Sequence, residues 1–194
     1  MAIPHGIWAV ASDLQSVDQA AQWCSSARSA AAFTVRRSAG SDSQILQILQ
    51  TLEQEATWLG CHGRADLAQV VHAAAVIAGV RSLPVASYRR SFPTLLVGAS
   101  THTMAEAQAA KEAGAHFLFY GPIWDTPEKS GILKPRGLEK LKAVVALGLP
   151  VIAIGGIEEV GQVQQLQEAG AHGAAVLRAA RNAQLLQELV RAWR

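Results

Sequence analysis

Short β-rich runs alternate with longer helical patterns along the whole chain, and this alternation constrains the fold more than any other feature. The predicted strands span residues 6–11, 31–36, 57–61, 76–80, 94–97, 116–120, 151–154 and 173–177. The predicted helices span residues 14–28, 41–55, 64–75, 85–90, 103–113, 137–147 and 158–169, with a last helix that ends at Trp193. Eight strand–helix units in this order predict an α/β fold, a closed parallel (β/α)8 TIM barrel with short loops.

A short internal repeat supports this series of equivalent units. Residues 112–116 and 168–172 share the sequence Glu-Ala-Gly-Ala-His. Each is predicted to be a helix end, a glycine in the left-handed cap conformation and the start of a strand. His116 and His172 are therefore expected at the end of the barrel that serves stability, and neither is a catalytic candidate.

The composition fits one domain over residues 1–194. The chain is 50% hydrophobic and 16% charged, which is typical of a folded domain. Its 194 residues are enough for one sizeable hydrophobic core and few for two. A net charge of +2 without a basic cluster argues against nucleic acid as a partner. Two cysteines make neither a disulfide framework nor a metal cluster. We see no signal peptide or membrane span, so we expect a soluble, cytoplasmic protein, and a homodimer is a reasonable expectation.

The junction after the sixth predicted strand is rich in polar groups. An apolar strand runs into residues 121–131, a loop with glycine, proline, hydroxyl, carboxylate and ammonium groups. Binding chemistry in β/α proteins is built at the carboxyl ends of parallel strands. Thr126 and Lys129 are therefore predicted to contact a small anionic substrate, with a solvated loop lysine as the alternative for Lys129.

A second candidate anion site follows the seventh and eighth strands. Gly155 and Gly156 end the seventh strand, where glycines allow backbone N–H groups to approach a ligand. The loops after strands seven and eight of such barrels often form a phosphate site. The eighth strand leads to Arg178 and Ala179, and Arg178 is predicted either to contact the phosphate or to point to solvent.

Residues 97–177 resemble the thiamin-phosphate synthase and thiazole tautomerase (TenI-like) superfamily. The matching pieces are residues 98–102 (GASTH), 121–126 (GPIWDT), 137–138 (GL) and 153–156 (AIGG). The resemblance implies a phosphate-binding barrel of thiamin biosynthesis, with a small phosphorylated thiazole as ligand.

The same resemblance separates two branches of the superfamily. The synthase joins a pyrimidine diphosphate to the thiazole phosphate and needs Mg²⁺, held in part by an acidic residue after the third strand. This chain has Gly63 at that position and no carboxylate in residues 79–84 after the fourth strand. The resemblance therefore implies the tautomerase branch, which moves a proton and needs no metal or other cofactor.

The acid/base group of such a reaction is not fixed by the resemblance. The position of the tautomerase histidine is Pro122 here, and proline cannot transfer a proton. The candidates are His102 after the fifth strand and Cys61 and His62 at the end of the third, with helix capping and burial as structural alternatives. Arg36 ends the second strand and is predicted to meet a substrate carboxylate.

The leading hypothesis is a thiazole tautomerase-like isomerase that aromatises a thiazole carboxylate phosphate by metal-independent proton transfer. Two alternatives remain open. One is a phosphate-ligand binding or regulatory protein that has lost catalysis, motivated by Pro122. The other is a thiamin-phosphate synthase, disfavoured because the acidic Mg²⁺ ligands are missing.

Overall fold

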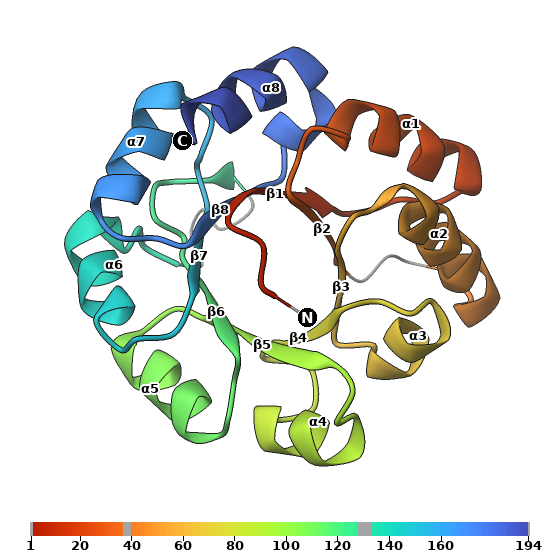
Figure 1. Ribbon diagram of the computed structural model, residues 1–194, viewed down its shortest axis with the longest axis horizontal. Helices are drawn as coiled ribbons and strands as arrows, with labels where there is room; N and C mark the ends of the chain where they lie inside the picture. The colour runs from red at the N-terminus through yellow and green to blue at the C-terminus, as the bar shows by residue number, and fades with distance from the viewer. Residues whose placement is uncertain (1, 37–39, 128–132, 194) are drawn as a thin grey trace.

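Eight parallel strands close into a barrel in the computed structural model, which describes residues 2–36, 40–127 and 133–193. The strands follow one another in chain order, and β8 pairs with β1 to close the ring (Figure 1). Their bounds are β1 Gly6–Ala11, β2 Ala32–Val35, β3 Leu59–His62, β4 Ala75–Ala78, β5 Leu96–Thr101, β6 Phe117–Tyr120, β7 Val151–Ile154 and β8 Gly173–Val176. The predicted (β/α)8 architecture is confirmed.

The helices form an outer ring around the strands (Figure 1). Their bounds are α1 Val17–Ala27, α2 Asp42–Glu55, α3 Ala65–Val70, α4 Val85–Ser91, α5 Met104–Glu112, α6 Gly137–Val145, α7 Val160–Glu168 and α8 Ala183–Ala192, with a 3-10 turn, η2, at Ala179–Arg181. Side-chain caps explain several of the starts. Ser41 accepts a hydrogen bond from the Gln44 amide while the Gln44 side chain accepts one from the Ser41 amide, a capping box that begins α2.

The third helix is shorter than the sequence predicts. A helix is predicted over 64–75, but α3 ends at Val70 and Ala75 already belongs to β4. His72 takes a φ of 49°, and the Ala74 amide donates a hydrogen bond to the Leu59 carbonyl. Pairing with β3 therefore overrides the helix propensity of these alanines.

The fifth strand is longer than predicted and runs from Leu96 to Thr101 instead of ending at residue 97. Gly98 lies in its middle, directly beside the ring of Phe117 on β6. A Cβ atom at residue 98 would come within 2.4 Å of that ring. Here the glycine is a packing requirement of the barrel interior and does not mark a turn.

Side chains alternate between two buried regions along each strand. One region lies between the strands and the helices, and the other fills the barrel interior. Trp8 is fully buried at the centre of the interior, with ring centroids of Trp58, Phe117 and Phe119 at 4.7, 5.6 and 5.7 Å. The interior is therefore a packed core rather than a pore.

The amino-terminal segment crosses the end of the barrel where the strands begin (Figure 1). The indole Nε1 of Trp8 donates a hydrogen bond to the Pro4 carbonyl, and Nε2 of His172 lies 3.0 Å from the Ile3 carbonyl oxygen. The ring of His5 packs against those of His172 and Trp193. His172 thus has a structural role at this end of the barrel.

His116 occupies the equivalent position before β6. Its Nδ1 accepts a hydrogen bond from the Val97 amide, and its Nε2 lies 2.8 Å from a guanidinium nitrogen of Arg89. Both repeated histidines therefore serve contacts at strand starts, as the repeat predicts.

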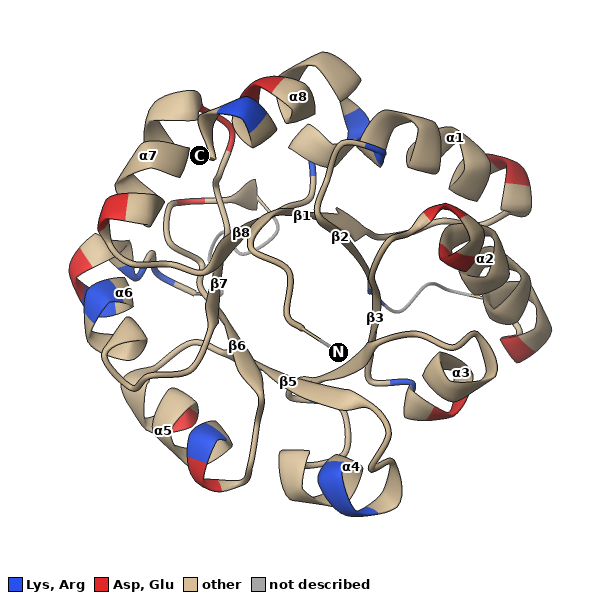
Figure 2. Cartoon of the chain, viewed as in Figure 1, with Lys and Arg blue, Asp and Glu red and all other residues tan. Residues whose placement is uncertain are grey.

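Lysine, arginine, aspartate and glutamate residues are spread over the helices and loops (Figure 2). Within the described ranges, none of them is fully buried. Among the described helices, none is long and apolar enough to cross a membrane.

Candidate functional site

Polar side chains enter the barrel interior near the carboxyl ends of neighbouring strands. Strand alternation turns three polar side chains toward the barrel interior. They are Thr34 on β2, His62 on β3 and Ser100 on β5. The Oγ1 atom of Thr34 and the Nε2 atom of His62 are buried, and neither has a hydrogen-bond partner within the described residues. Buried polar atoms are normally paired, so a bound molecule or water is expected to satisfy these two.

His62 is held as a neutral imidazole. Its ring lies 5.7 Å from the ring of Phe119, inside the barrel. Burial, followed by the positive charge of Arg36, lowers the pKa of His62 to about 3. The structure thus brings together two of the predicted site residues, His62 and Arg36, at the ends of β2 and β3.

Cys61 faces the other way. It packs among the residues between the strands and the helices, whereas its neighbour His62 faces the interior. Burial, followed by the charge of Asp66, raises the pKa of Cys61 to about 12. The stabilised thiolate that acid/base chemistry at Cys61 would need is therefore missing.

The two cysteines are expected to be unreactive in the folded protein. Both are buried, and burial is the main cause that raises the pKa of Cys24 to about 11. At pH 8 we expect both thiols to react with Ellman's reagent on the order of 100-fold more slowly than a free thiol. Full reaction in denaturant provides the control. A fast native phase from either cysteine would contradict this expectation.

His102 also lies away from the barrel interior. It follows β5, and its Nδ1 lies 2.6 Å from the Gly121 carbonyl oxygen. Because a carbonyl only accepts, Nδ1 carries the proton and donates. The backbone amide of His102 donates to the carboxylate of Glu106 in the first turn of α5. These contacts turn the ring toward a cavity on the helix side, together with Tyr120 of β6.

The glycine pair after β7 forms a left-handed turn, with φ of 103° at Gly155 and 70° at Gly156. The loop that follows β6 packs directly on this turn. A Cβ atom at residue 155 would lie 2.6 Å from the Pro122 Cα, and one at residue 156 would lie 2.5 Å from the Asp125 carbonyl oxygen. Both positions therefore require glycine for close approach as well as for backbone conformation.

The hydrogen bonds of this turn leave its amides available. The Gly155 carbonyl accepts from the Trp124 amide, and the Gly156 carbonyl accepts from the Gln162 side chain. Over the described ranges, neither glycine amide donates a hydrogen bond to a protein group. Free amides at a left-handed turn are the groups that bind phosphate in such sites.

Thr126 is buried in the loop after β6. Lys129, in the same loop, lies outside the described residues. Arg178 is half-buried after β8 and forms an ion pair with Glu158, so part of its charge is already compensated. Ala179 is buried and begins η2.

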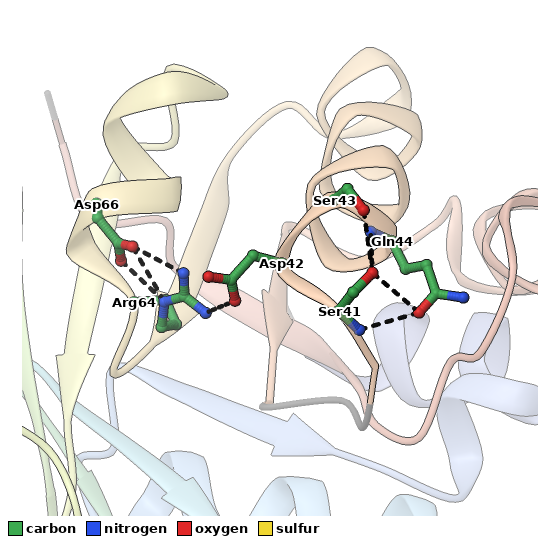
Figure 3. A network of polar contacts seen from close by, with 6 residues as sticks. All are labelled: Ser41, Asp42, Ser43, Gln44, Arg64 and Asp66. Carbon is green, nitrogen blue, oxygen red and sulfur yellow. Dashed lines mark hydrogen bonds and ion pairs between the residues drawn. The ribbon is translucent and has the colours of Figure 1, made fainter.

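The residues after β3 do not fit a metal site. Gly63 offers no side-chain ligand and takes a φ of 74°. The carboxylates nearby are engaged by Arg64, which lies 2.8 Å from Asp42 and 2.7 Å from Asp66 (Figure 3). Among the described residues, no group of three acidic, histidine or cysteine side chains is placed to hold a metal ion.

Sequence reasoning missed Thr34 and Ser100. Ser100 belongs to one of the motifs quoted above, but its inward orientation depends on β5 continuing to Thr101. Thr34 carries no motif, and only strand alternation could have pointed to it.

Residues 9–180 match the family described as thiamine monophosphate synthase (TMP-TENI). The chain belongs to this family. A relative from Caldivirga maquilingensis named "Thiamine-phosphate synthase" is 33% identical over 167 residues, which are 81% of this chain and 80% of the relative. One of the same name from Anaeromyxobacter dehalogenans is 46% identical over 118 residues, which are 60% of this chain and 53% of the relative.

The match spans about half the length of several of these curated relatives. The fold is shared with a solved structure, the thiamine phosphate pyrophosphorylase from Pyrococcus furiosus. It has a TM-score of 0.82 and 23% identity, with 97% of this chain and 96% of that chain covered.

Proposed function

We propose that this member of the family is a thiazole tautomerase-like isomerase. Its substrate would be a thiazole carboxylate phosphate, and His62 would move the proton without a metal. The observation that carries the proposal is the neutral, unpartnered imidazole of His62 inside the barrel, beside the guanidinium of Arg36. A neutral imidazole with a free nitrogen accepts a proton at one carbon and returns it to another.

The proposed arrangement assigns one role to each part of the site. The amides of Gly155 and Gly156 bind the phosphate, and Arg36 binds the carboxylate. His62 then takes a proton from one carbon and delivers it to another, so that the ring becomes aromatic. Only carbon–hydrogen bonds are broken and formed, with a shift of ring double bonds, and neither redox chemistry nor a leaving group is involved.

The low pKa of His62 is consistent with this role only when substrate is bound. A base works best when its pKa lies near the working pH. Arg36 is one of the two causes of the low pKa. A substrate carboxylate that neutralises Arg36 and places negative charge beside the ring would raise the pKa of His62 toward neutrality.

A second candidate, thiamin-phosphate synthase, is favoured by the names of the relatives. Against it stands Gly63, where the synthase carries a carboxylate for Mg²⁺, together with the engagement of Asp42 and Asp66 by Arg64. The experiment is a direct comparison. The pure protein is incubated with the thiazole tautomer with and without EDTA, and separately with thiazole phosphate, pyrimidine diphosphate and Mg²⁺.

Aromatisation that is insensitive to EDTA supports the isomerase. Condensation that needs Mg²⁺ would replace it with the synthase. Binding of the thiazole phosphate without turnover would overturn both and leave the third hypothesis, a binding or regulatory protein with proline at residue 122.

Replacement of His62 by glutamine is expected to lower kcat/KM for the tautomer by at least about 100-fold, the usual loss for an acid/base group. Binding of the aromatic thiazole carboxylate phosphate product should change by less than about threefold, because glutamine preserves polarity and volume. The measurement is steady-state aromatisation together with calorimetric binding.

The matched control is His72→Asn, which removes an exposed histidine in the turn between α3 and β4. Asparagine tolerates the positive φ of that position. Equal losses in the two variants, or full activity in His62→Gln, would remove His62 from the mechanism.

A further inference from the structure

A cavity of about 280 Å³ lies on the outside of the barrel, between α5 and α6. Its polar lining consists of His102, Thr103, Tyr120, Arg136 and Lys140. Met104 of α5 and Ala143 of α6 supply an apolar wall. We call this space the lateral cavity.

The lateral cavity is separate from the barrel interior. Tyr120 belongs to the residues packed between strands and helices, whereas Phe119, one position earlier on β6, faces the interior. Strand alternation therefore puts the sheet between the lateral cavity and His62. The remaining lining residues come from α6, from the start of α5 and from the residues just before these two helices.

The electrostatics of the lateral cavity favour an anion. Two cationic side chains, Arg136 and Lys140, line it, and none of its lining residues is acidic. The Nε atom of Arg136 is buried without a hydrogen-bond partner among the described residues, so this guanidinium still has an unsatisfied donor. A buried donor without an acceptor is costly unless a bound group supplies one.

Neutral donors complete the lining. Burial is the largest cause that raises the pKa of Tyr120, so its phenol keeps its proton at neutral pH. Thr103 contributes a hydroxyl as well as the cap of α5, where it accepts from the Glu106 amide. Glu106 is the carboxylate that opposes an anion here, but it accepts a hydrogen bond from the His102 amide at 2.6 Å.

We propose that the lateral cavity is a binding site for a small organic phosphate, distinct from the site in the barrel. Arg136 and Lys140 together match the double negative charge of a phosphate monoester, and Tyr120 adds a hydroxyl donor. Met104 and Ala143 would contact the apolar body that carries the phosphate. A volume of about 280 Å³ lies just below the usual range of about 300–1,000 Å³ for ligand sites, which fits a small ligand.

The lateral cavity also contacts the groups that hold the loop after β6. The Arg136 amide donates to the Pro122 carbonyl at 2.8 Å, and the Gly137 amide donates to the Ile123 carbonyl at 3.1 Å. The His102 ring donates to the Gly121 carbonyl. A ligand bound to these side chains is therefore expected to shift the signals of residues 121–123.

The test is a titration of the isotopically labelled protein with phenyl phosphate at constant ionic strength, followed by heteronuclear NMR. The expected result is a saturable shift of the Arg136 Nε–H signal and of the amides of Tyr120 and residues 121–123. Phosphate bound in the barrel would instead move the amides of Gly155 and Gly156, so the two sites are read separately. Inorganic phosphate should bind the lateral cavity about tenfold more weakly, because it lacks the apolar body.

Lys140→Gln is expected to weaken lateral binding about tenfold, and Tyr120→Phe by a few fold. Lys142→Gln is the matched control, because it removes the same charge from the same helix at a lysine that is paired with Glu139 outside the cavity. The proposal is overturned if saturating phenyl phosphate leaves the Arg136 Nε–H signal in place. It is also overturned if Lys140→Gln and Lys142→Gln weaken binding equally.

Discussion

Replacement of Trp8 by alanine is expected to lower the free energy of unfolding by about 3–5 kcal/mol, the usual cost of deleting a large buried aromatic side chain. Trp8 is fully buried and contacts three aromatic rings in the barrel interior. Its indole also holds the amino-terminal segment through the Pro4 carbonyl. Two of the surrounding rings belong to β6 and the third, Trp58, lies just before β3, so the closed barrel cannot collapse easily around the space left behind.

Urea unfolding, followed by circular dichroism and by fluorescence, measures this loss. Trp8→Phe is the matched variant, because it keeps an aromatic ring and gives up the hydrogen bond to Pro4, worth about 1 kcal/mol. It should recover most of the stability. A loss below about 1.5 kcal/mol in Trp8→Ala would mean that the interior repacks more readily than its close contacts indicate.

Replacement of Gly156 by aspartate is expected to weaken binding of a thiazole phosphate by more than about 100-fold. The added Cβ would lie 2.5 Å from the Asp125 carbonyl oxygen and 2.8 Å from the Trp124 Cβ, so the loop after β6 must move. The new carboxylate would also stand beside the proposed phosphate position, and like charges in contact cost several kcal/mol. Isothermal titration with the thiazole phosphate measures the effect.

Two variants separate the causes. Gly156→Ala keeps the displacement of the loop without the charge and should give an intermediate loss. Gly148→Asp adds the same charge at a φ of 83°, in the turn before β7, where an added Cβ meets no atom within 4 Å. Gly148→Asp should therefore have the same backbone strain as Gly156→Asp and bind the thiazole phosphate normally. If Gly156→Asp also binds normally, the glycine turn is not the phosphate site.

The fold was accessible from the sequence because strand and helix periodicities repeat in order through the chain. The errors occur where packing overrides local preference. The alanines near residue 75 favour a helix but pair with β3. Gly98 lies inside β5 and does not end it, and the missing side chain leaves room for the ring of Phe117.

The sequence predicted which strand ends carry the candidate site, but not which of their side chains face the barrel interior. Cys61 and His62 are adjacent, and a shift of one residue in register would exchange the faces they point to. The sequence does not contain that register. His102 was expected at the same end, and its hydrogen bond to the Gly121 carbonyl turns it to the helix side. Lys129 and the homodimer stay predictions.

The amino-terminal segment covers the end of the barrel where the strands begin. Its contacts with Trp8 and His172, together with the packed aromatic interior, prevent small molecules from passing through that end. A ligand that binds among the carboxyl ends of the strands must therefore enter and leave by the same opening. Substrate and product of any reaction performed there would exclude each other, and product would act as a competitive inhibitor of the next turnover.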